Sequence, residues 1–391
     1  MMSKKSPQLR FEGFTDDWEE RKLGDITKIS TGKLDANAMV ENGKYDFYTS
    51  GIKKYRIDVA AFEGPSITIA GNGATVGYMH LADNKFNAYQ RTYVLQEFLV
   101  DRSFIFSEIG NKLPKKIKQE ARTGNIPYIV MDMLTELKVS IPQNNTEQKK
   151  IGDFFKQLDD TIALHQRKLD LLKETKKGFL QKMFPKNGAK VPEIRFPGFT
   201  GDWEDRKLSS IAERVTRKNK NNESTLPLTI SAQDGLVDQN DYFNKQVASR
   251  DVTGYFLVKN GEFAYNKSYS NGYPWGAIKR LDKYEMGVLS TLYIVFKPTA
   301  INSQFLVSYY ETTRWYREVS KNAAEGARNH GLLNISPNDF FNTLLTIPKS
   351  AEEQQQIGSF FKQLDDTIAL HQRKLDLLKE QKKGFLQKMF V

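Results

Sequence analysis

The chain has 391 residues, more than one typical hydrophobic core holds, so its length predicts two or three domains. Hydrophobic residues make up 39% of the sequence and aromatic residues 12%, which is enough for packed interiors and excludes a disordered chain. The formal net charge of +11 favours a polyanionic partner such as nucleic acid, although many proteins are basic for solubility alone.

Cysteine is absent from the sequence, which excludes disulfides, thiolate metal sites and cysteine nucleophiles. The longest apolar stretches, such as residues 292–296, are far too short to span a bilayer. The basic N-terminal residues are not followed by an apolar run, so they do not read as a secretory signal. We therefore expect a cytoplasmic protein without membrane contact.

The sequence contains two internal repeats. LRFEGFTDDWEERKL at residues 9–23 returns as IRFPGFTGDWEDRKL at 194–208, and we call these segments the leaders. Residues 151–184 align without gaps to 357–390 and differ only at Asp153/Ser359 and Thr175/Gln381. The region between leader and long repeat is about 21 residues longer in the second half, and its sequence differs. The ends of each half are therefore kept constant while the middle varies.

The long repeat has the periodicity of a helix. Its a/d seam runs over more than four heptads and consists of Ile151, Phe155, Leu158, Ile162, His165, Leu169, Leu172, Lys176, Phe179 and Met183. Pro185 ends the first copy. A helix of this length measures roughly 50 Å. We predict that the two copies pair as an antiparallel intramolecular coiled coil. Polar seam residues set its register and bind no ligand: His165, Lys176, His371 and Lys382.

Residues outside the seam form a second stripe that a two-helix coil does not need. This stripe favours either a further helical partner or packing of the leaders and middle regions on the helices. The partner-binding candidates are Phe154, Leu164, Arg167, Leu171, Phe360, Leu370, Arg373 and Leu377.

The two middle regions follow one order of predicted elements. In the first they are strand, glycine loop and strand (65–81), strand (88–98), helix (102 to Pro114), loop (125–128), and helix with strand (129–141). In the second they are strand, aromatic loop and strand (261–281), strand (289–298), helix (303–323) and loop (325–336).

These patterns predict an α+β protein with two mixed α/β domains, separated by two long helices, and an internal pseudo-two-fold repeat. The expected boundaries are 1–145 for the first domain with its leader, 146–185 for the first long helix, 186–350 for the second leader and domain, and 351–391 for the second long helix.

No constellation of catalytic residues stands out in the sequence. GNGATVG at 71–77 is one residue off a dinucleotide fingerprint and lacks the following helix that such a fingerprint needs. The sequence has no phosphate-binding loop, no histidine pair at metal-ligand spacing and no Pro-Pro pair of the kind an amino-methyltransferase uses. Glu-x-Lys trios, such as Glu20/Lys22, are expected by chance in so charged a chain. We predict no catalytic residue, metal site or cofactor in this chain.

Polar and aromatic side chains instead gather in the glycine-marked loops, which suits groove contacts and phosphate clamps on DNA. The simpler interpretations are an ordinary hairpin for 71–77, a solvated loop for 326–331 and partial burial for the aromatic residues of 265–275. The DNA-binding candidates are Thr49, Lys53, Lys54, Asn72, Thr75, Arg91, Thr92, Asn125, Gln233, Lys267, Ser268, Tyr269, Ser270, Tyr273, Arg328, Asn329 and His330.

The leaders, the EEQQQIGSFF start of the second long repeat and the LDLLKE helix ending in KKGFLQKMF resemble the DNA-specificity subunits of type I restriction-modification systems. The resemblance is strongest to staphylococcal-type members and covers essentially the whole chain. It implies two target recognition domains, each binding one half of a bipartite double-stranded DNA sequence. It also implies that the paired helices fix the gap between the half-sites.

The resemblance further implies partners. Two modification subunits would dock on the helices, bind S-adenosylmethionine and methylate adenine at N6. Two restriction subunits would add translocation and cleavage that depend on ATP and Mg. The chain itself would be non-catalytic and hold no cofactor. From the residues alone, two alternatives stay open: an enzyme with its own active site, and a helical interaction protein that binds protein or RNA.

Overall fold

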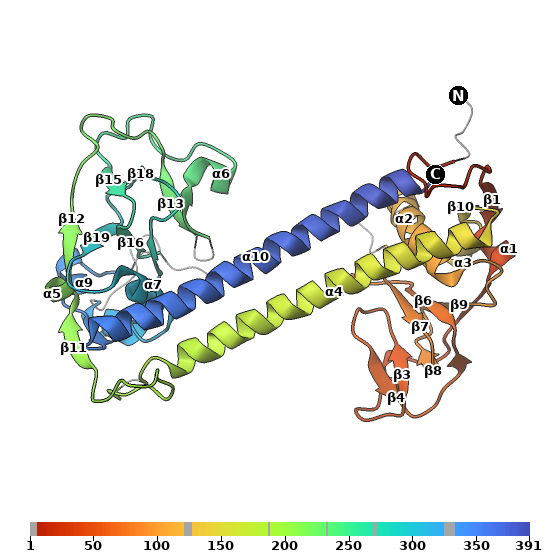
Figure 1. Cartoon of the computed structure of the whole chain (residues 1–391), viewed down its shortest axis with the longest axis horizontal. Coiled ribbons are helices and arrows are strands. Elements are labelled where there is room, and N and C mark those ends of the chain that lie inside the picture. Colours follow the sequence, from red (N-terminus) through yellow and green to blue (C-terminus); the bar gives the residue numbers. More distant parts are fainter. Residues whose placement is uncertain (1–5, 121–126, 187, 232–233, 269–271, 324–332) are drawn as a thin grey trace. The chain divides into compact units, whose positions relative to one another are not determined.

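The structure is a computed structural model that describes residues 6–120, 127–186, 188–231, 234–268, 272–323 and 333–391. The chain forms two compact units (Figure 1). The first unit contains residues 1–167 together with 372–391, and the second unit contains residues 168–371. Each long helix therefore contributes one part to each unit.

The first unit is built on a four-stranded sheet in the order β2-β9-β6-β7, next to a second sheet in the order β4-β3-β8-β5 and a separate β1-β10 pair. Its strands are β1 (Glu19–Lys22), β2 (Lys28–Thr31), β3 (Tyr45–Tyr48), β4 (Tyr55–Ile57), β5 (Phe62–Glu63), β6 (Ser66–Ala70), β7 (Met79–Ala82), β8 (Lys85–Ala88), β9 (Thr92–Gln96) and β10 (Lys138–Ile141). Its shorter helices are α1 (Leu23–Ile26), η1 (Ala36–Ala38), α2 (Arg102–Glu120) and α3 (Met131–Thr135).

The second unit repeats this plan, with a four-stranded sheet in the order β12-β19-β16-β17 and three strand pairs, β13-β14, β15-β18 and β11-β20. Its strands are β11 (Glu204–Lys207), β12 (Ala212–Val215), β13 (Leu228–Ser231), β14 (Gly235–Asp238), β15 (Phe256–Lys259), β16 (Phe263–Asn266), β17 (Ala277–Arg280), β18 (Met286–Leu289), β19 (Ile294–Pro298) and β20 (Leu344–Ile347). Its shorter helices are α5 (Leu208–Ile211), α6 (Gln239–Phe243), α7 (Ser303–Glu311), α8 (Tyr316–Asn322) and α9 (Pro337–Phe341).

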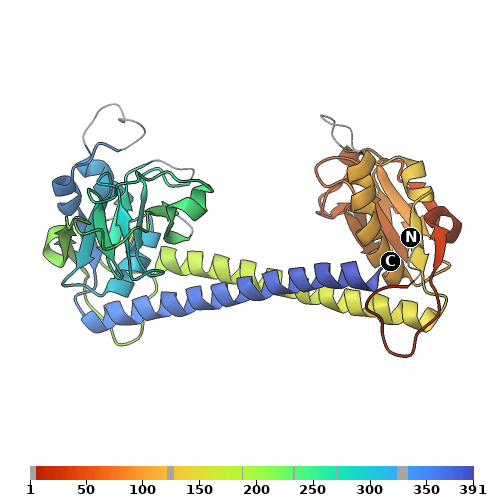
Figure 2. The same ribbon diagram turned by 90° about the horizontal axis from the view of Figure 1, so that it is seen from above.

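The two long helices are α4 (Asn145–Lys182) and α10 (Ala351–Met389). In both units they lie side by side and run in opposite directions (Figure 2). The ring centres of Phe154 and Phe385 are 5.0 Å apart in the first unit, and the ring centres of Phe179 and Phe360 are 5.1 Å apart in the second. The predicted fold class, with its antiparallel coiled coil, is confirmed.

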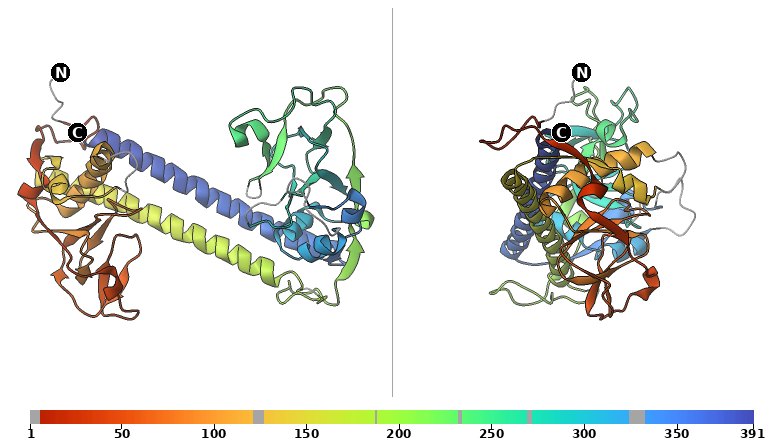
Figure 3. Two further views of the ribbon diagram at one scale, coloured as in Figure 1. Left: turned by 180° about the vertical axis from the view of Figure 1, so that it is seen from behind. Right: turned by 90° about the vertical axis from the view of Figure 1, so that its right-hand side faces the viewer.

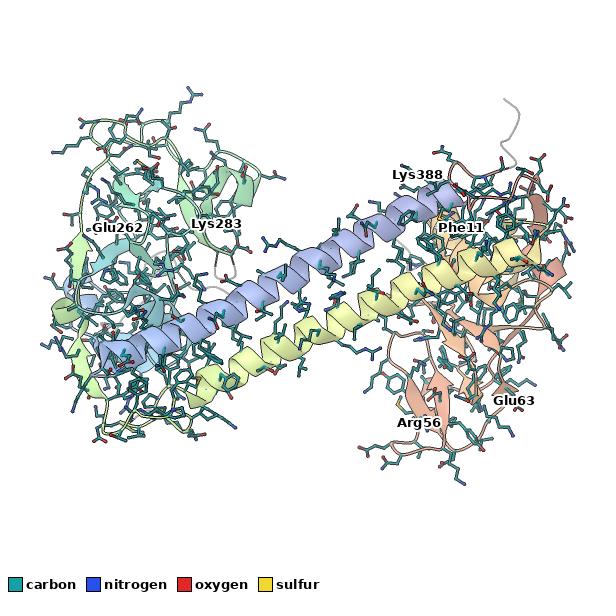
Figure 4. All side chains as sticks on the ribbon, viewed as in Figure 1. Phe11, Arg56, Glu63, Glu262, Lys283 and Lys388 are labelled. Atoms are coloured by element: carbon teal, nitrogen blue, oxygen red, sulfur yellow. The ribbon has the colours of Figure 1, made fainter. Side chains whose placement is uncertain are left out.

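The core of each unit is completed by the end of the other repeat's helix. Met389 and Phe390 are buried in the first unit, where Phe390 packs against Trp18. Met183 and Phe184 take the same place in the second unit. The leaders hold these ends, because the Leu9 amide donates to the Lys388 carbonyl and the Ile194 amide to the Lys182 carbonyl. Figure 4 shows Phe11 of the first leader and Lys388 at the same end of the helix pair.

Glycine permits the close packing of each long helix against its own domain. A Cβ on Gly152 would lie 2.6 Å from the backbone nitrogen of Phe104, at the start of α2. The equivalent Gly358 would place one 2.7 Å from the nitrogen of Phe305, at the start of α7. Because backbone cannot yield at such distances, both positions require glycine.

Two predicted helices differ from those observed. Helix α2 continues past Pro114 to Glu120, because burial of Leu113 and partial burial of Ile117 in the core outweigh the hydrogen bond that proline removes. The predicted helix 303–323 is two helices, α7 and α8. Between them the backbone at Thr312 is extended and the Trp315 side chain is buried.

The strand predicted over 88–98 is also shorter. It begins at Thr92, because residues 89–91 form the connection from β8.

The extra length of the second half includes a longer connection before its β15 strand. Residues 58–61 join β4 to β5 in the first unit, whereas residues 239–255 join β14 to β15 and contain α6, which lies against β13 and β14 (Figure 3). Val252 of this connection is buried against Leu257 and Val288. In the first unit the short β4–β5 connection lines a cavity of about 680 Å³, to which Val59 and Ala61 contribute.

Candidate nucleic-acid interface

Two loops of the first unit converge, and we call residues 49–54 and 71–78 the first loop cluster. The Ser50 hydroxyl donates to Asn72 Oδ1 at 2.5 Å. The Thr75 hydroxyl donates to the Ser50 carbonyl, and His80 Nε2 lies 3.4 Å from the Gly51 carbonyl oxygen. The structure therefore brings together five predicted DNA-binding residues: Thr49, Lys53, Lys54, Asn72 and Thr75.

The two lysines of this cluster are exposed and carry positive charge that no described carboxylate neutralises within ion-pair distance. Lys53 Nζ lies 5.2 Å from the centre of the Tyr55 ring, and Lys54 Nζ lies 5.3 Å from that of Tyr48. Such cation–π contacts orient an ammonium group while leaving its donors free. These lysines are therefore available to phosphates.

Two exposed tyrosines outside the predicted set belong to this surface: Tyr78 lies in the first loop cluster, and Tyr128 forms a backbone bridge with Asn72. The Tyr78 ring centre is 4.9 Å from that of His80. Burial lowers the pKa of His80 below its ordinary value, which favours the neutral ring. Tyr78 and His80 alternate with Gly77 and Met79 directly after a glycine loop, and this spacing of two ring side chains at the start of a strand is the sequence signal that would have found them.

The remaining candidates of the first unit differ in accessibility. Arg91 is exposed in the turn before β9, and its carbonyl accepts from the Gly71 amide at 2.8 Å. Thr92 is buried within β9, opposite Ala70, so its side chain has no surface to offer DNA. Asn125 lies outside the described residues.

In the second unit, described candidates follow β16. Lys267 is half-buried, and its Nζ donates to the Ile335 carbonyl at 3.3 Å. Burial lowers the pKa of Lys267. Ser268 is half-buried, and Tyr273 packs against the core. The other candidates lie outside the described residues: Gln233, Tyr269, Ser270, Arg328, Asn329 and His330.

The two units place different residues at one equivalent position. The Ile129 amide donates to the Gly71 carbonyl at 2.7 Å, and the Leu333 amide donates to the Lys267 carbonyl at 3.0 Å. Both carbonyls belong to the residue directly after the central strand, β6 or β16. Asn72 and Ser268, the next residues along the chain, are therefore structural equivalents in a shared frame.

The long helices carry a second candidate surface. Leu164 and Leu171 of α4 are 63% and 60% exposed, and their repeat equivalents on α10, Leu370 and Leu377, are each 58% exposed. We call these four residues the repeated leucines. Arg167 and Arg373 are exposed beside them.

The two phenylalanines among the partner-binding candidates are only half-buried. Phe154 packs against Phe385, and Phe360 packs against Phe179. Only part of each ring is therefore left for a further partner.

The described residues contain no group of three or more His, Cys, Asp or Glu side chains that could hold a metal ion. Among the described helices, none is both long and apolar enough to cross a membrane.

Comparisons with known proteins point to one family. The family model described as "Type I restriction modification DNA specificity domain" matches this chain twice, over residues 15–174 and 200–380. The chain is similar to the type I restriction enzyme EcoDI specificity subunit of Escherichia coli, with 33% identity over 182 residues, which cover 46% of this chain and 40% of that protein. That match thus spans less than half of either protein.

Two further relatives are similar over nearly their whole length. The type I restriction enzyme MjaVIII specificity subunit of Methanocaldococcus jannaschii is 22% identical over 95% of this chain and 91% of its own length. The crystal structure of a type I restriction-modification system S subunit from M. genitalium superposes with a TM-score of 0.68 at 18% identity, covering 99% of both chains, and so shows the same fold. The resemblance deduced from the sequence is confirmed, and the chain belongs to the family of type I restriction-modification DNA specificity proteins, with one specificity domain in each half.

Proposed function

We propose that this chain is the DNA-reading subunit of a type I restriction-modification complex and that each unit reads one half of a bipartite site in double-stranded DNA. The observation that carries this proposal is that the two units share one arrangement of strands but differ in the loops that follow these strands. The main sheets of the two units have equivalent order, β2-β9-β6-β7 and β12-β19-β16-β17, yet the second residue after the central strand is Asn72 in one and Ser268 in the other. A frame that is kept while its loops change is suited to reading two different sequences.

The long helices act as the spacer in this proposal. Helix α4 has 38 residues and α10 has 39, and each belongs to both units. A helix of this length measures about 57 Å, longer than one turn of DNA at ~34 Å. Because α4 and α10 are nearly identical in sequence, the spacer pairs with itself and fixes the gap between the half-sites.

The repeated leucines dock two copies of a modification subunit. A leucine side chain that is about 60% exposed leaves apolar area in contact with water. Each long helix carries one such pair of leucines, at equivalent positions of the repeat. Two equivalent surfaces suit two copies of one partner. That partner would bind S-adenosylmethionine and methylate adenine at N6, and two restriction subunits would supply cleavage that depends on ATP and Mg. The chain itself is non-catalytic, binds no cofactor and acts in the cytoplasm.

Two experiments on the purified full-length chain test this function. Duplex DNA, added in excess to a chain bound to labelled duplex, should displace the label, whereas RNA of equal length should not. Incubation with DNA, S-adenosylmethionine, ATP and Mg should leave the DNA neither methylated nor cleaved. Equal competition by RNA, or modification by the chain alone, contradicts the proposal.

A further inference from the structure

Asn72 is held by the protein on three sides. Its backbone forms an isolated bridge with Tyr128, and the neighbouring Gly71 is bonded through its amide to Arg91 and through its carbonyl to Ile129. The Ser50 hydroxyl donates to the Asn72 side-chain oxygen at 2.5 Å. Ser50 is itself held, since its carbonyl accepts from the Thr75 hydroxyl. The amide group of Asn72 is thus fixed in one orientation.

The fixed orientation leaves the nitrogen of the Asn72 side chain for a ligand. Because Oδ1 accepts from Ser50, the two N–H donors of Nδ2 remain to be paired with acceptors. Among the described residues, no acceptor lies within hydrogen-bond distance of Nδ2. Asn72 is half-buried, so the group is only partly hydrated and is already ordered before it meets a ligand.

We propose that Asn72 is a specificity-determining residue of the first unit, that it donates from Nδ2 to an acceptor on a base edge, and that Ser50 is its positioning residue. The acceptors that fit are purine N7, guanine O6 and thymine O4, whereas cytosine offers a donor at this edge of the major groove. Ser268 is the equivalent residue of the second unit. This inference rests on the proposed function and adds the chemistry of one reading contact to it.

The test selects duplexes from a random pool with the purified full-length chain and compares the enriched motifs. Asn72→Asp replaces two donors with an acceptor while keeping the size of the side chain. We expect the preference at one base pair of one half-site to change by about tenfold, toward a base with an amino group, which is cytosine or adenine. The other half-site should stay as it is in the wild-type motif.

Two variants serve as matched controls. Ser50→Ala removes the hydroxyl that orients the amide, so it should broaden the preference at the same base pair without shifting it to another base. Ser268→Ala should alter the other half-site only. Each of these variants removes one half-buried hydroxyl, so a folding defect is not expected, and thermal unfolding checks it.

The outcomes separate this inference from the proposed function. A wild-type chain that enriches no sequence overturns both. A wild-type motif that Asn72→Asp leaves unchanged overturns the inference alone. A uniform loss of affinity with an unchanged motif also overturns it, because that result assigns Asn72 to a phosphate.

Discussion

The guanidinium of Arg10 forms two hydrogen bonds with the carboxylate of Glu147, from Nε to Oε1 at 2.6 Å and from Nη2 to Oε2 at 2.8 Å. Arg195 and Glu353 repeat the same geometry in the second unit, at 2.7 and 2.8 Å. Both glutamates are buried and lie in the first turn of a long helix. Each pair therefore anchors a leader to the helix of its own half.

Replacing Arg10 by Ala should strongly destabilise the first unit. The change leaves the Glu147 carboxylate buried without its partner, and such a loss costs about 3–5 kcal/mol of unfolding free energy. Lys22→Ala is the control, because the Lys22–Glu136 pair is exposed and solvent screening leaves it little effect on stability. Chemical denaturation of both variants measures the difference. Equal, small losses would show that the leader does not anchor the helix.

The helix pair is fixed more strongly in the second unit than in the first. Lys176 Nζ lies 2.5 Å from Asp365 Oδ1 and 2.7 Å from Glu311 Oε2, whereas its repeat equivalent Lys382 pairs with Asp159 among the described residues. Burial alone would lower the pKa of Lys176, but the two carboxylates outweigh it and raise that pKa. Gly110 stands in α2 where α7 has Glu311, so the first unit lacks the third charge.

Lys176→Ala should accordingly cost more stability than Lys382→Ala, by roughly 1–2 kcal/mol, because it removes the cation that contacts two partly buried carboxylates and leaves only the nearby Lys279 to offset their charge. Amide hydrogen exchange, measured separately for α7 and for α2, reports the local stability of each unit independently. The same loss of protection in both variants would contradict the asymmetry.

Glu108 should make the first unit less stable as the pH rises. Burial raises the pKa of this carboxyl to about 7, although the Ser140 amide, which donates to it at 3.0 Å, and Lys112, at 3.9 Å, oppose the shift. The unfolded chain releases this proton near its ordinary value of ~4.3, while the folded chain keeps it. Stability from this group is therefore present at low pH and is lost between about pH 4.5 and 7.

Glu108→Gln isolates this effect. At pH 4.5 the variant and the wild type should have nearly the same unfolding free energy. At pH 8 the variant should be more stable than the wild type by roughly 2–3 kcal/mol. Denaturant titrations at the two pH values measure it. A difference that does not change with pH would mean that Glu108 has the same pKa in the folded and the unfolded chain, which would contradict the prediction.

The repeated leucines should be needed for the partner and dispensable for the fold. Substituting Leu164 and Leu171 by Asp, or Leu370 and Leu377 by Asp, places charges where the side chains already face water, so unfolding free energy should change by less than about 1 kcal/mol. Co-purification with the modification subunit should fall with either pair and be lost with both. Full recovery of the partner by the fourfold variant would exclude this docking surface.

A matched substitution distinguishes docking from folding. Leu169 lies in the same helix but is buried in the helix pair. Leu169→Ala should cost about 2–5 kcal/mol of unfolding free energy, as a buried leucine does. Under conditions in which this variant remains folded, it should co-purify with the modification subunit as the wild type does.

Periodicity predicted the long helices well because one signal, the a/d spacing, governs both their formation and their pairing. The seam residues from Ile151 to Met183 are buried or half-buried, and the repeated leucines outside the seam are exposed. The sequence could not predict that Phe390 fills the first unit and Phe184 the second. These contacts join residues far apart in the chain, and both phenylalanines belong to the same repeated motif, so local patterning carries no information on which unit receives which one.

Of the candidate site, the sequence could predict loop positions but not accessibility. Asn72 and Lys54 lie in loops as expected, because glycine and polar side chains mark loops, and their contact with DNA stays a prediction. Thr92 adjoins an exposed arginine, and only the strand register shows that its side chain is buried. Helix α2 continues past Pro114 because core packing of Leu113 and Ile117 overrides local propensity, and no local signal reports tertiary packing.

The central claim is that this chain directs a complex to a bipartite DNA sequence. Modified-base sequencing of DNA from cells that carry the chain with its modification subunit, compared with cells that lack only this chain, tests it most directly. We predict one bipartite N6-methyladenine motif that disappears when the chain is absent. If the modification subunit is present and co-purifies with the chain, a methylation pattern that is the same in both cells would contradict the claim.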